Sequence, residues 1–89
     1  MRRVFFASRF EKKLKIFHSR HPELSAAVEA AITTIAKDPR AAQLHTHPLN
    51  GVLSDYFAAR LSRDYRIVFA LEPGRVIFLD VGTHDDVYR

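Results

Sequence analysis

The spacing of hydrophobic and polar residues changes along this 89-residue chain. In the last third, three runs rich in aromatic and β-branched residues follow a two-residue period, which is typical of strands: Tyr56–Leu61, Tyr65–Leu71 and Arg75–Val81. Ser62–Asp64 and Glu72–Gly74 separate these runs as turns. The pattern predicts an antiparallel meander.

Upstream of the meander, the chain begins with a strand and a basic helix. Arg3–Ala7 reads as a short strand, and Ser8 and Glu11 have the spacing of a capping box for a helix over about Arg9–Arg20. The apolar residues of this helix recur at i, i+4 and i+7, as Phe10, Leu14 and Phe17. We therefore expect one apolar stripe facing a core, with the basic residues on the other side.

A second helix is predicted over about Pro22–Lys37. Proline is favoured at a first helical position and disfavours helix at the residue before it, here His21, while Asp38-Pro39 ends the helix. Its buried stripe comprises Leu24, Val28, Ala31, Ile32 and Ile35. The order strand, helix, helix, strand, strand, strand predicts an α+β fold, with the helical hairpin on one face of a small antiparallel sheet.

Between the second helix and the meander, Arg40–Asp55 reads as a turn and a long loop. Leu44 and Leu49 are expected to anchor this loop, and Asn50-Gly51 is expected to form a tight turn. Loops of this length in small domains are often functional.

The turn at Ser62–Asp64 decides where two arginines point. If it holds three residues, Arg60 lies opposite Arg66 and both project from one face of the sheet. A two-residue turn puts them on opposite faces, because a slip of one residue reverses every side chain. The sequence pattern leaves both registers open.

Length and composition predict one folded domain spanning residues 1–89. A chain this short forms a single core, and 47% hydrophobic residues are enough to fold it. It has no cysteine, which excludes disulfides and thiolate metal sites and agrees with a reducing cytosol. The longest apolar run near the start, Val4–Ala7, is too short for a signal peptide or a membrane span. We expect a soluble cytoplasmic protein.

Positive charge is concentrated in the first 20 residues. The formal net charge of the chain is +4, and this segment sets seven Lys and Arg against the single acid Glu11. The cations are Arg2, Arg3, Arg9, Lys12, Lys13, Lys15 and Arg20. Such a face predicts a polyanion, with nucleic acid one candidate, or an acidic partner; the alternative is a solvated helix face.

The histidines admit two chemical interpretations. In the first, His45 and His47 present two imidazoles from an extended segment, and His84 with Asp85 completes a zinc shell. This spacing permits a metal site but is not diagnostic of one, since histidines are ordinary in surface loops.

In the second interpretation, the same region cleaves an RNA phosphodiester without a metal. That reaction needs a base for the ribose 2′-hydroxyl, positive charge near the phosphate oxygens and an acid for the leaving 5′-oxygen. Histidine suits the acid or base because its ordinary pKa, about 6.5, lies near working pH. His84 follows Gly82 at a strand exit, where Asp85 or Asp86 can orient it.

Three further side chains complete this interpretation. Arg60 and Arg66 are candidate clamps for the scissile phosphate, and Tyr88 can stack on a base or donate a hydrogen bond. Each also has a purely structural interpretation. The arginines can be surface residues paired with Asp64 or Asp55, and Tyr88 can be the last hydrophobic anchor of the chain.

Two stretches, residues 60–69 and 76–88, together resemble the C-terminal half of RelE/ParE-superfamily toxins of bacterial toxin–antitoxin pairs. The likeness is greatest to the YafQ-like and RelE-like mRNA interferases. His47-Pro48-Leu49-Asn50-Gly51 also resembles the HPL-x-G segment of the YafQ-like branch. The predicted order of strands and helices agrees with that superfamily over nearly the whole chain.

The resemblance implies a metal-independent endoribonuclease, with no cofactor, that cuts mRNA in the ribosomal A site. It also implies a cognate antitoxin that wraps around the toxin in a hetero-oligomer. By position, His84 matches the catalytic histidine, His47 the histidine of the loop, and Asp64 an active-site aspartate. Tyr88 matches a functional aromatic residue and Arg66 an arginine near the phosphate.

The sequence departs from the family pattern at the first strand of the meander, which is the second strand of the predicted fold. Arg60 stands where YafQ-like members have a histidine, and arginine is a poor proton acceptor. Phe57 and Ala59 stand where RelE-like members have lysines. The general base is therefore left between His47 and His84.

Two other functions share this fold. A ParE-like toxin binds DNA gyrase and needs no catalytic histidine, and an inactive homologue binds only its antitoxin. The Gly-Thr-His-Asp-Asp exit and the HPL loop favour the nuclease.

Overall fold

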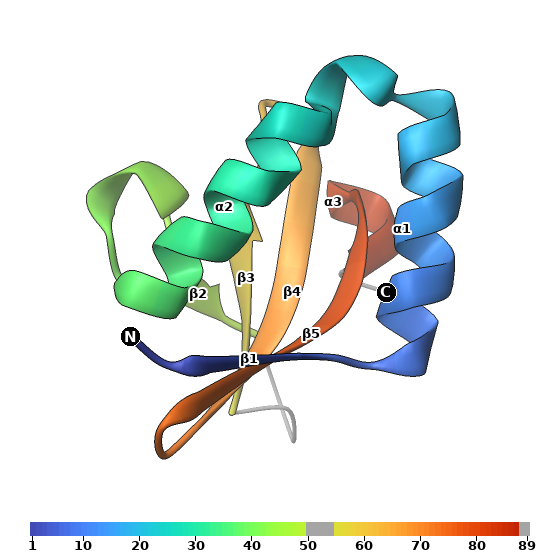
Figure 1. The fold of residues 1–89 in the computed structure, drawn as a ribbon. Coiled ribbons are helices and arrows are strands. Elements are labelled where there is room, and N and C mark those ends of the chain that lie inside the picture. Colours follow the sequence, from blue (N-terminus) through green and yellow to red (C-terminus); the bar gives the residue numbers. More distant parts are fainter. Residues whose placement is uncertain (50–54, 88–89) are drawn as a thin grey trace.

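The computed structural model describes residues 1–49 and 55–87. It confirms the predicted α+β fold, in which a helical hairpin covers one face of a sheet (Figure 1). Two predicted features, the Asn50-Gly51 turn and the position of Tyr88, lie outside the described residues. In chain order the elements are β1 (Arg3–Phe6), α1 (Ser8–Arg20), the 3₁₀ turn η1 (Pro22–Leu24), α2 (Ser25–Lys37), the 3₁₀ turn η2 (Ala42–Leu44), β2 (His47–Pro48), β3 (Tyr56–Arg60), β4 (Tyr65–Glu72), β5 (Arg75–Thr83) and α3 (His84–Val87).

The sheet has five strands in the order β1-β5-β4-β3-β2. The meander β3-β4-β5 is antiparallel, as its sequence predicts, and β2 adds to it antiparallel to β3. The sheet is nonetheless mixed, because β1 pairs with β5 in parallel, with Arg3 opposite Arg75. Beyond Phe78, the described residues add no strand to β5 on its β1 side, and α1 lies along this edge (Figure 1).

The core lies between the hairpin and the sheet. The predicted stripe of α1 is buried at Phe10 and Phe17, and the stripe of α2 is buried at Val28, Ala31 and Ile35. They pack against sheet residues that include Ile67, Phe69, Phe78 and Val81. Figure 1 shows α2 crossing over β3 and β4 while α1 stands beside β5.

The predicted capping box at Ser8 and Glu11 is wrong. Ser8 already belongs to α1, and Ala7 takes the cap position without any side-chain hydrogen bond. The backbone N–H of Glu11 donates to the carbonyl of Ala7 at 3.1 Å. Ser8 lies one position too late in the chain to accept that bond.

The hairpin turn is tighter than the sequence indicates. The predicted second helix begins with the 3₁₀ turn η1, and α2 itself starts at Ser25. The Ser25 Oγ and His18 Nδ1 are 3.0 Å apart and hydrogen-bonded, which ties α2 to α1 across the turn.

The predicted loop from Arg40 to Asp55 contains more structure than expected. Leu44 is buried, as predicted, at the end of η2. The edge strand β2 was not predicted, because it has only two residues and one of them is a proline. None of the described helices is long and apolar enough to cross a membrane.

Candidate functional site

The arginines of the meander point the same way. Arg60 pairs with Arg66 across β3 and β4, which settles the register that the sequence left open. Arg66 also pairs with Gly82 across β4 and β5. Directly opposed residues of antiparallel strands project from the same face. Because the alternating neighbours Ile67 and Val81 belong to the core under the hairpin, this row lies on the other face, which we call the outer face.

His47 belongs to the same outer face. It pairs with Ala58, which pairs with Val68, so His47 stands one row along from Arg60. A hollow of about 300 Å³ opens on this face and is lined in part by Val68, with Val87 of α3 at its rim. The other lining residues are Ala7, Arg9, Leu49, Tyr56, Leu79 and Asp80. Among the described residues, the lining of the hollow is therefore mostly apolar, with Arg9 and Asp80 as its charged members.

Arg66 is engaged by the turn before it. Its Nη1 donates to the carbonyl oxygens of Ser62 and Tyr65, both at 3.0 Å, and approaches the carbonyl of Arg63 at 3.3 Å. These acceptors are backbone groups, whereas the structural alternative from the sequence was a carboxylate of Asp64 or Asp55. The Nη1 atom of Arg66 therefore holds the β3–β4 turn, whereas Arg60 is exposed and no described hydrogen bond engages its side chain.

This difference predicts that two matched substitutions lower the free energy of unfolding by different amounts. Arg66→Ala is expected to lower the free energy of unfolding by about 1–2 kcal/mol, because charged hydrogen bonds to the turn are lost. Arg60→Ala is expected to change it by less than about 0.5 kcal/mol, because the side chain is exposed. Urea denaturation of the two variants measures both values. Equal losses of stability would contradict a structural role for Arg66.

Asp64 lies in that turn, directly before β4, and its side chain is exposed. The next residue, Tyr65, points to the hairpin side, where its hydroxyl is hydrogen-bonded to His21 Nε2 at 3.1 Å. The turn held by Arg66 therefore sets where the Asp64 carboxylate stands, at the same end of the sheet as Arg60.

His84 is the first residue of α3 and its side chain is 63% exposed. It is not packed beneath the hairpin. Its Nδ1 lies 3.6 Å from Oδ1 of Asp85, a carboxylate that is itself 97% exposed. Of the two aspartates expected to orient His84, Asp85 is the one beside its ring.

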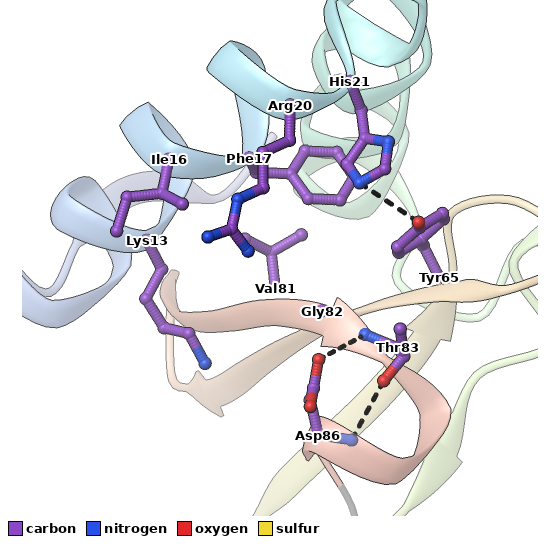
Figure 2. A pocket seen from close by; sticks show the side chains of 10 residues that line it. All are labelled: Lys13, Ile16, Phe17, Arg20, His21, Tyr65, Val81, Gly82, Thr83 and Asp86. Carbon is purple, nitrogen blue, oxygen red and sulfur yellow. Dashed lines mark hydrogen bonds between the residues drawn. The ribbon is translucent and has the colours of Figure 1, made fainter.

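Asp86, unlike Asp85, makes hydrogen bonds that hold α3 at the end of β5. The backbone N–H of Thr83 donates to Asp86 Oδ2, and the N–H of Asp86 donates to Thr83 Oγ1, both at 3.2 Å (Figure 2). This reciprocal pair is a capping box. Gly82 makes room for it, since a Cβ there would lie 3.0 Å from the Asp86 Cβ. These three residues determine where His84 stands, and the Thr-x-x-Asp spacing is the sequence signal that could have identified them.

The zinc interpretation finds no cluster to support it in the described chain. Within residues 1–49 and 55–87, no three His, Asp or Glu side chains are grouped closely enough to hold a metal ion. The arrangement that remains is an exposed imidazole beside a carboxylate, with guanidinium groups and a second imidazole on the outer face. These groups can exchange protons and stabilise negative charge.

Comparison with known proteins gives a consistent result. A family model described as "Bacterial toxin of type II toxin-antitoxin system, YafQ" matches residues 2–89. The crystal structure of YafQ from E. coli strain BL21(DE3) superposes with a TM-score of 0.84, at 21% identity over 100% of both chains. A chain of the E. coli DinJ–YafQ toxin–antitoxin complex gives the same values. A YoeB/ParE toxin from Agrobacterium tumefaciens gives 0.80, at 14% identity over 92% of this chain and 98% of that one. At these identities the structures establish a shared fold. The search of curated proteins finds no match.

Proposed function

The chain belongs to the YafQ family of toxins of bacterial type II toxin–antitoxin systems, and on that premise we propose that it is a metal-independent endoribonuclease that cleaves mRNA in the ribosomal A site. The observation that carries the proposal is the position of His84. Its imidazole is exposed just past the end of β5, two residues after Gly82, the strand position that pairs with Arg66.

The proposed reaction is a transfer within the RNA chain. A base removes the proton of a ribose 2′-hydroxyl, and the resulting oxygen attacks the adjacent phosphorus. The bond to the 5′-oxygen of the next nucleotide breaks, and an acid protonates that oxygen. The products are a 2′,3′-cyclic phosphate and a free 5′-hydroxyl. Negative charge grows on the phosphate oxygens, where a guanidinium stabilises it most.

The residues divide this work as follows. His84 is the general acid or base, and His47, on the outer face, is the candidate for the complementary role. Arg60 stabilises the phosphate, with Arg66 contributing the part of its guanidinium that the turn does not use. Asp64 stands in the turn beside them. Tyr88, which lies outside the described residues, keeps its proposed role of stacking on a base or donating a hydrogen bond.

The partners follow from the family and from the charge. A cognate antitoxin is proposed to bind and silence the toxin in a hetero-oligomer, by analogy with the DinJ–YafQ complex that matches this fold. The basic helix α1 is proposed to contact ribosomal RNA, because its cations are set against the single acid Glu11. With these partners, a cytoplasmic location is part of the proposal.

Expression of wild type and of His84→Gln in bacterial cells tests the proposal. We expect new mRNA 5′ ends at codon boundaries within translated regions, present with wild type and lost with the variant. Plasmid supercoiling, measured in the same cultures, should be unchanged. Inhibited supercoiling with intact mRNA would replace the proposal with gyrase inhibition, and no toxicity from either chain would leave only antitoxin binding.

A further inference from the structure

A second hollow lies at the edge of the sheet, away from the hollow on the outer face. It occupies about 280 Å³ between α1, the end of β5 and α3 (Figure 2). We call it the α1–β5 pocket. It is lined by Lys13, Ile16, Phe17, Arg20, His21, Tyr65, Val81, Gly82, Thr83 and Asp86. The sequence motifs did not predict a pocket formed by these residues.

One wall of the pocket is a cluster of three rings, from Phe17, His21 and Tyr65. Their centroids lie 5.0 Å apart for Phe17 and His21, 5.2 Å for Phe17 and Tyr65, and 4.8 Å for His21 and Tyr65. The hydrogen bond from Tyr65 to His21 fixes two of the rings, and Glu23 lies 3.6 Å from the other imidazole nitrogen. The wall is therefore preorganised.

The cations of the pocket are not equivalent. Lys13 is paired with Asp80, its Nζ lying 2.5 Å from a carboxylate oxygen that is largely buried. Arg20 is exposed, and Figure 2 shows its guanidinium reaching from α1 into the space above Val81. With Asp86 also on the lining, the pocket carries little net attraction for a bare anion. It offers flat rings, an apolar floor and one cation.

The pocket adjoins the candidate site without sharing its side chains. Gly82 and Thr83 line it, and His84 is the next residue, with consecutive Cα atoms about 3.8 Å apart. A single nucleotide of an RNA chain spans more than this distance. The nucleotide next to a phosphate bound at His84 can therefore reach the α1–β5 pocket.

We propose that the α1–β5 pocket binds one nucleobase of the RNA substrate, adjacent to the nucleotide that is cut. This proposal rests on the proposed ribonuclease function. Single-stranded RNA is held chiefly by stacking of unpaired bases on aromatic side chains and on arginine. The rings of His21 and Tyr65 together with Arg20 supply both, and a volume of about 280 Å³ has room for one base.

Binding can be tested without catalysis by amide NMR on the full chain carrying His84→Gln. The probes are the four nucleoside 5′-monophosphates, with ribose 5-phosphate and a hexaglutamate peptide as controls. We expect at least one nucleotide to shift Arg20, Tyr65, Gly82 and Thr83 in a saturable way, with a dissociation constant on the order of a millimolar. Equal shifts with ribose 5-phosphate would overturn the proposal in favour of an anion site. Shifts with hexaglutamate alone would overturn it in favour of an acidic protein segment.

Two charge reversals on α1 separate the pocket from general electrostatics. Arg20→Glu and Lys15→Glu change the net charge equally, but Lys15 lies roughly 140° around the helix from Arg20 and is not on the pocket. Arg20→Glu is expected to weaken nucleotide binding by about fivefold or more, and Lys15→Glu by less than about twofold. In cleavage assays Arg20→Glu should raise KM with kcat nearly unchanged. Equal effects of the two changes on nucleotide binding would overturn the pocket. Saturable nucleotide binding in a chain that cuts no mRNA would instead defeat the ribonuclease proposal and leave the pocket standing.

Discussion

Replacing His84 with alanine is expected to lower the single-turnover rate of mRNA cleavage on ribosomes by about 10²–10⁴-fold, the usual contribution of a general acid or base. The free energy of unfolding should change by less than about 0.5 kcal/mol, because the side chain is 63% exposed and makes no part of the core. The measurement is a quenched-flow time course with purified ribosomes and a defined mRNA, together with urea denaturation of the same preparation.

The control is a histidine of the helical hairpin, His18 in α1. His18→Gln removes an imidazole that is hydrogen-bonded to Ser25 between α1 and α2, and its cleavage rate should stay within about threefold of wild type, since it touches no reacting group. A His84→Ala rate inside that same range would show that this imidazole moves no proton in the reaction. His47→Ala would then be the variant to measure, because His47 has the second candidate imidazole, on the outer face.

The sequence predicted the parts of the fold that depend on local periodicity. The i, i+4, i+7 spacing of Phe10 and Phe17 gave the buried side of α1, and the two-residue period gave β3, β4 and β5. The parallel pairing of β1 with β5 was not predicted, because it joins residues more than 70 positions apart. The sequence of β1 or of β5 alone does not indicate which edge of the meander β1 will occupy.

Two capping-box motifs show that residue spacing alone does not predict a helix cap. Ser8 and Glu11 have the right spacing, but the helix already begins at Ser8, so the box does not form. Thr83 and Asp86 have the same spacing, and there the box does form. The difference lies in where backbone hydrogen bonding begins, and β5 determines that for the second motif by ending at Thr83.

The candidate site was predicted in its residue types and less well in its contacts. Arg60 and Arg66 could be placed on one face only once the turn length was known. The hydrogen bonds of Arg66 go to backbone carbonyl oxygens. Because every residue has such a group, no pattern of side chains in the sequence predicts these bonds. The sequence did not predict the α1–β5 pocket. Its lining comes from three separate stretches of the chain, which are brought together only in the folded protein.

The second large effect is expected at Phe78, in the middle of β5. Phe78 is fully buried, and its ring centroid lies 5.7 Å from that of Phe10, 5.8 Å from Phe6 and 6.2 Å from Phe69. Phe78→Ala should therefore lower the free energy of unfolding by about 3–5 kcal/mol, from lost burial and the cavity left behind. Because small domains are stable by only about 5–15 kcal/mol, a measurable fraction of this variant should be unfolded at 37 °C, a loss that urea denaturation followed by circular dichroism will report.

Phe5→Ala is the matched control for Phe78→Ala, since Phe5 lies on the adjacent strand β1 but is 38% exposed. Its loss should cost about 1 kcal/mol or less, because its ring contacts are chiefly with the guanidinium groups of Arg3 and Arg75. If Phe78→Ala lowers the free energy of unfolding no more than Phe5→Ala does, the rings of Phe6, Phe10, Phe69 and Phe78 are not the centre of the core. If the costs differ as expected, the two kinds of loss can be told apart. Phe78→Ala is expected to remove activity in proportion to the unfolded fraction, because Phe78 belongs to the core and not to the candidate site. His84→Ala is expected to remove activity from molecules that remain folded.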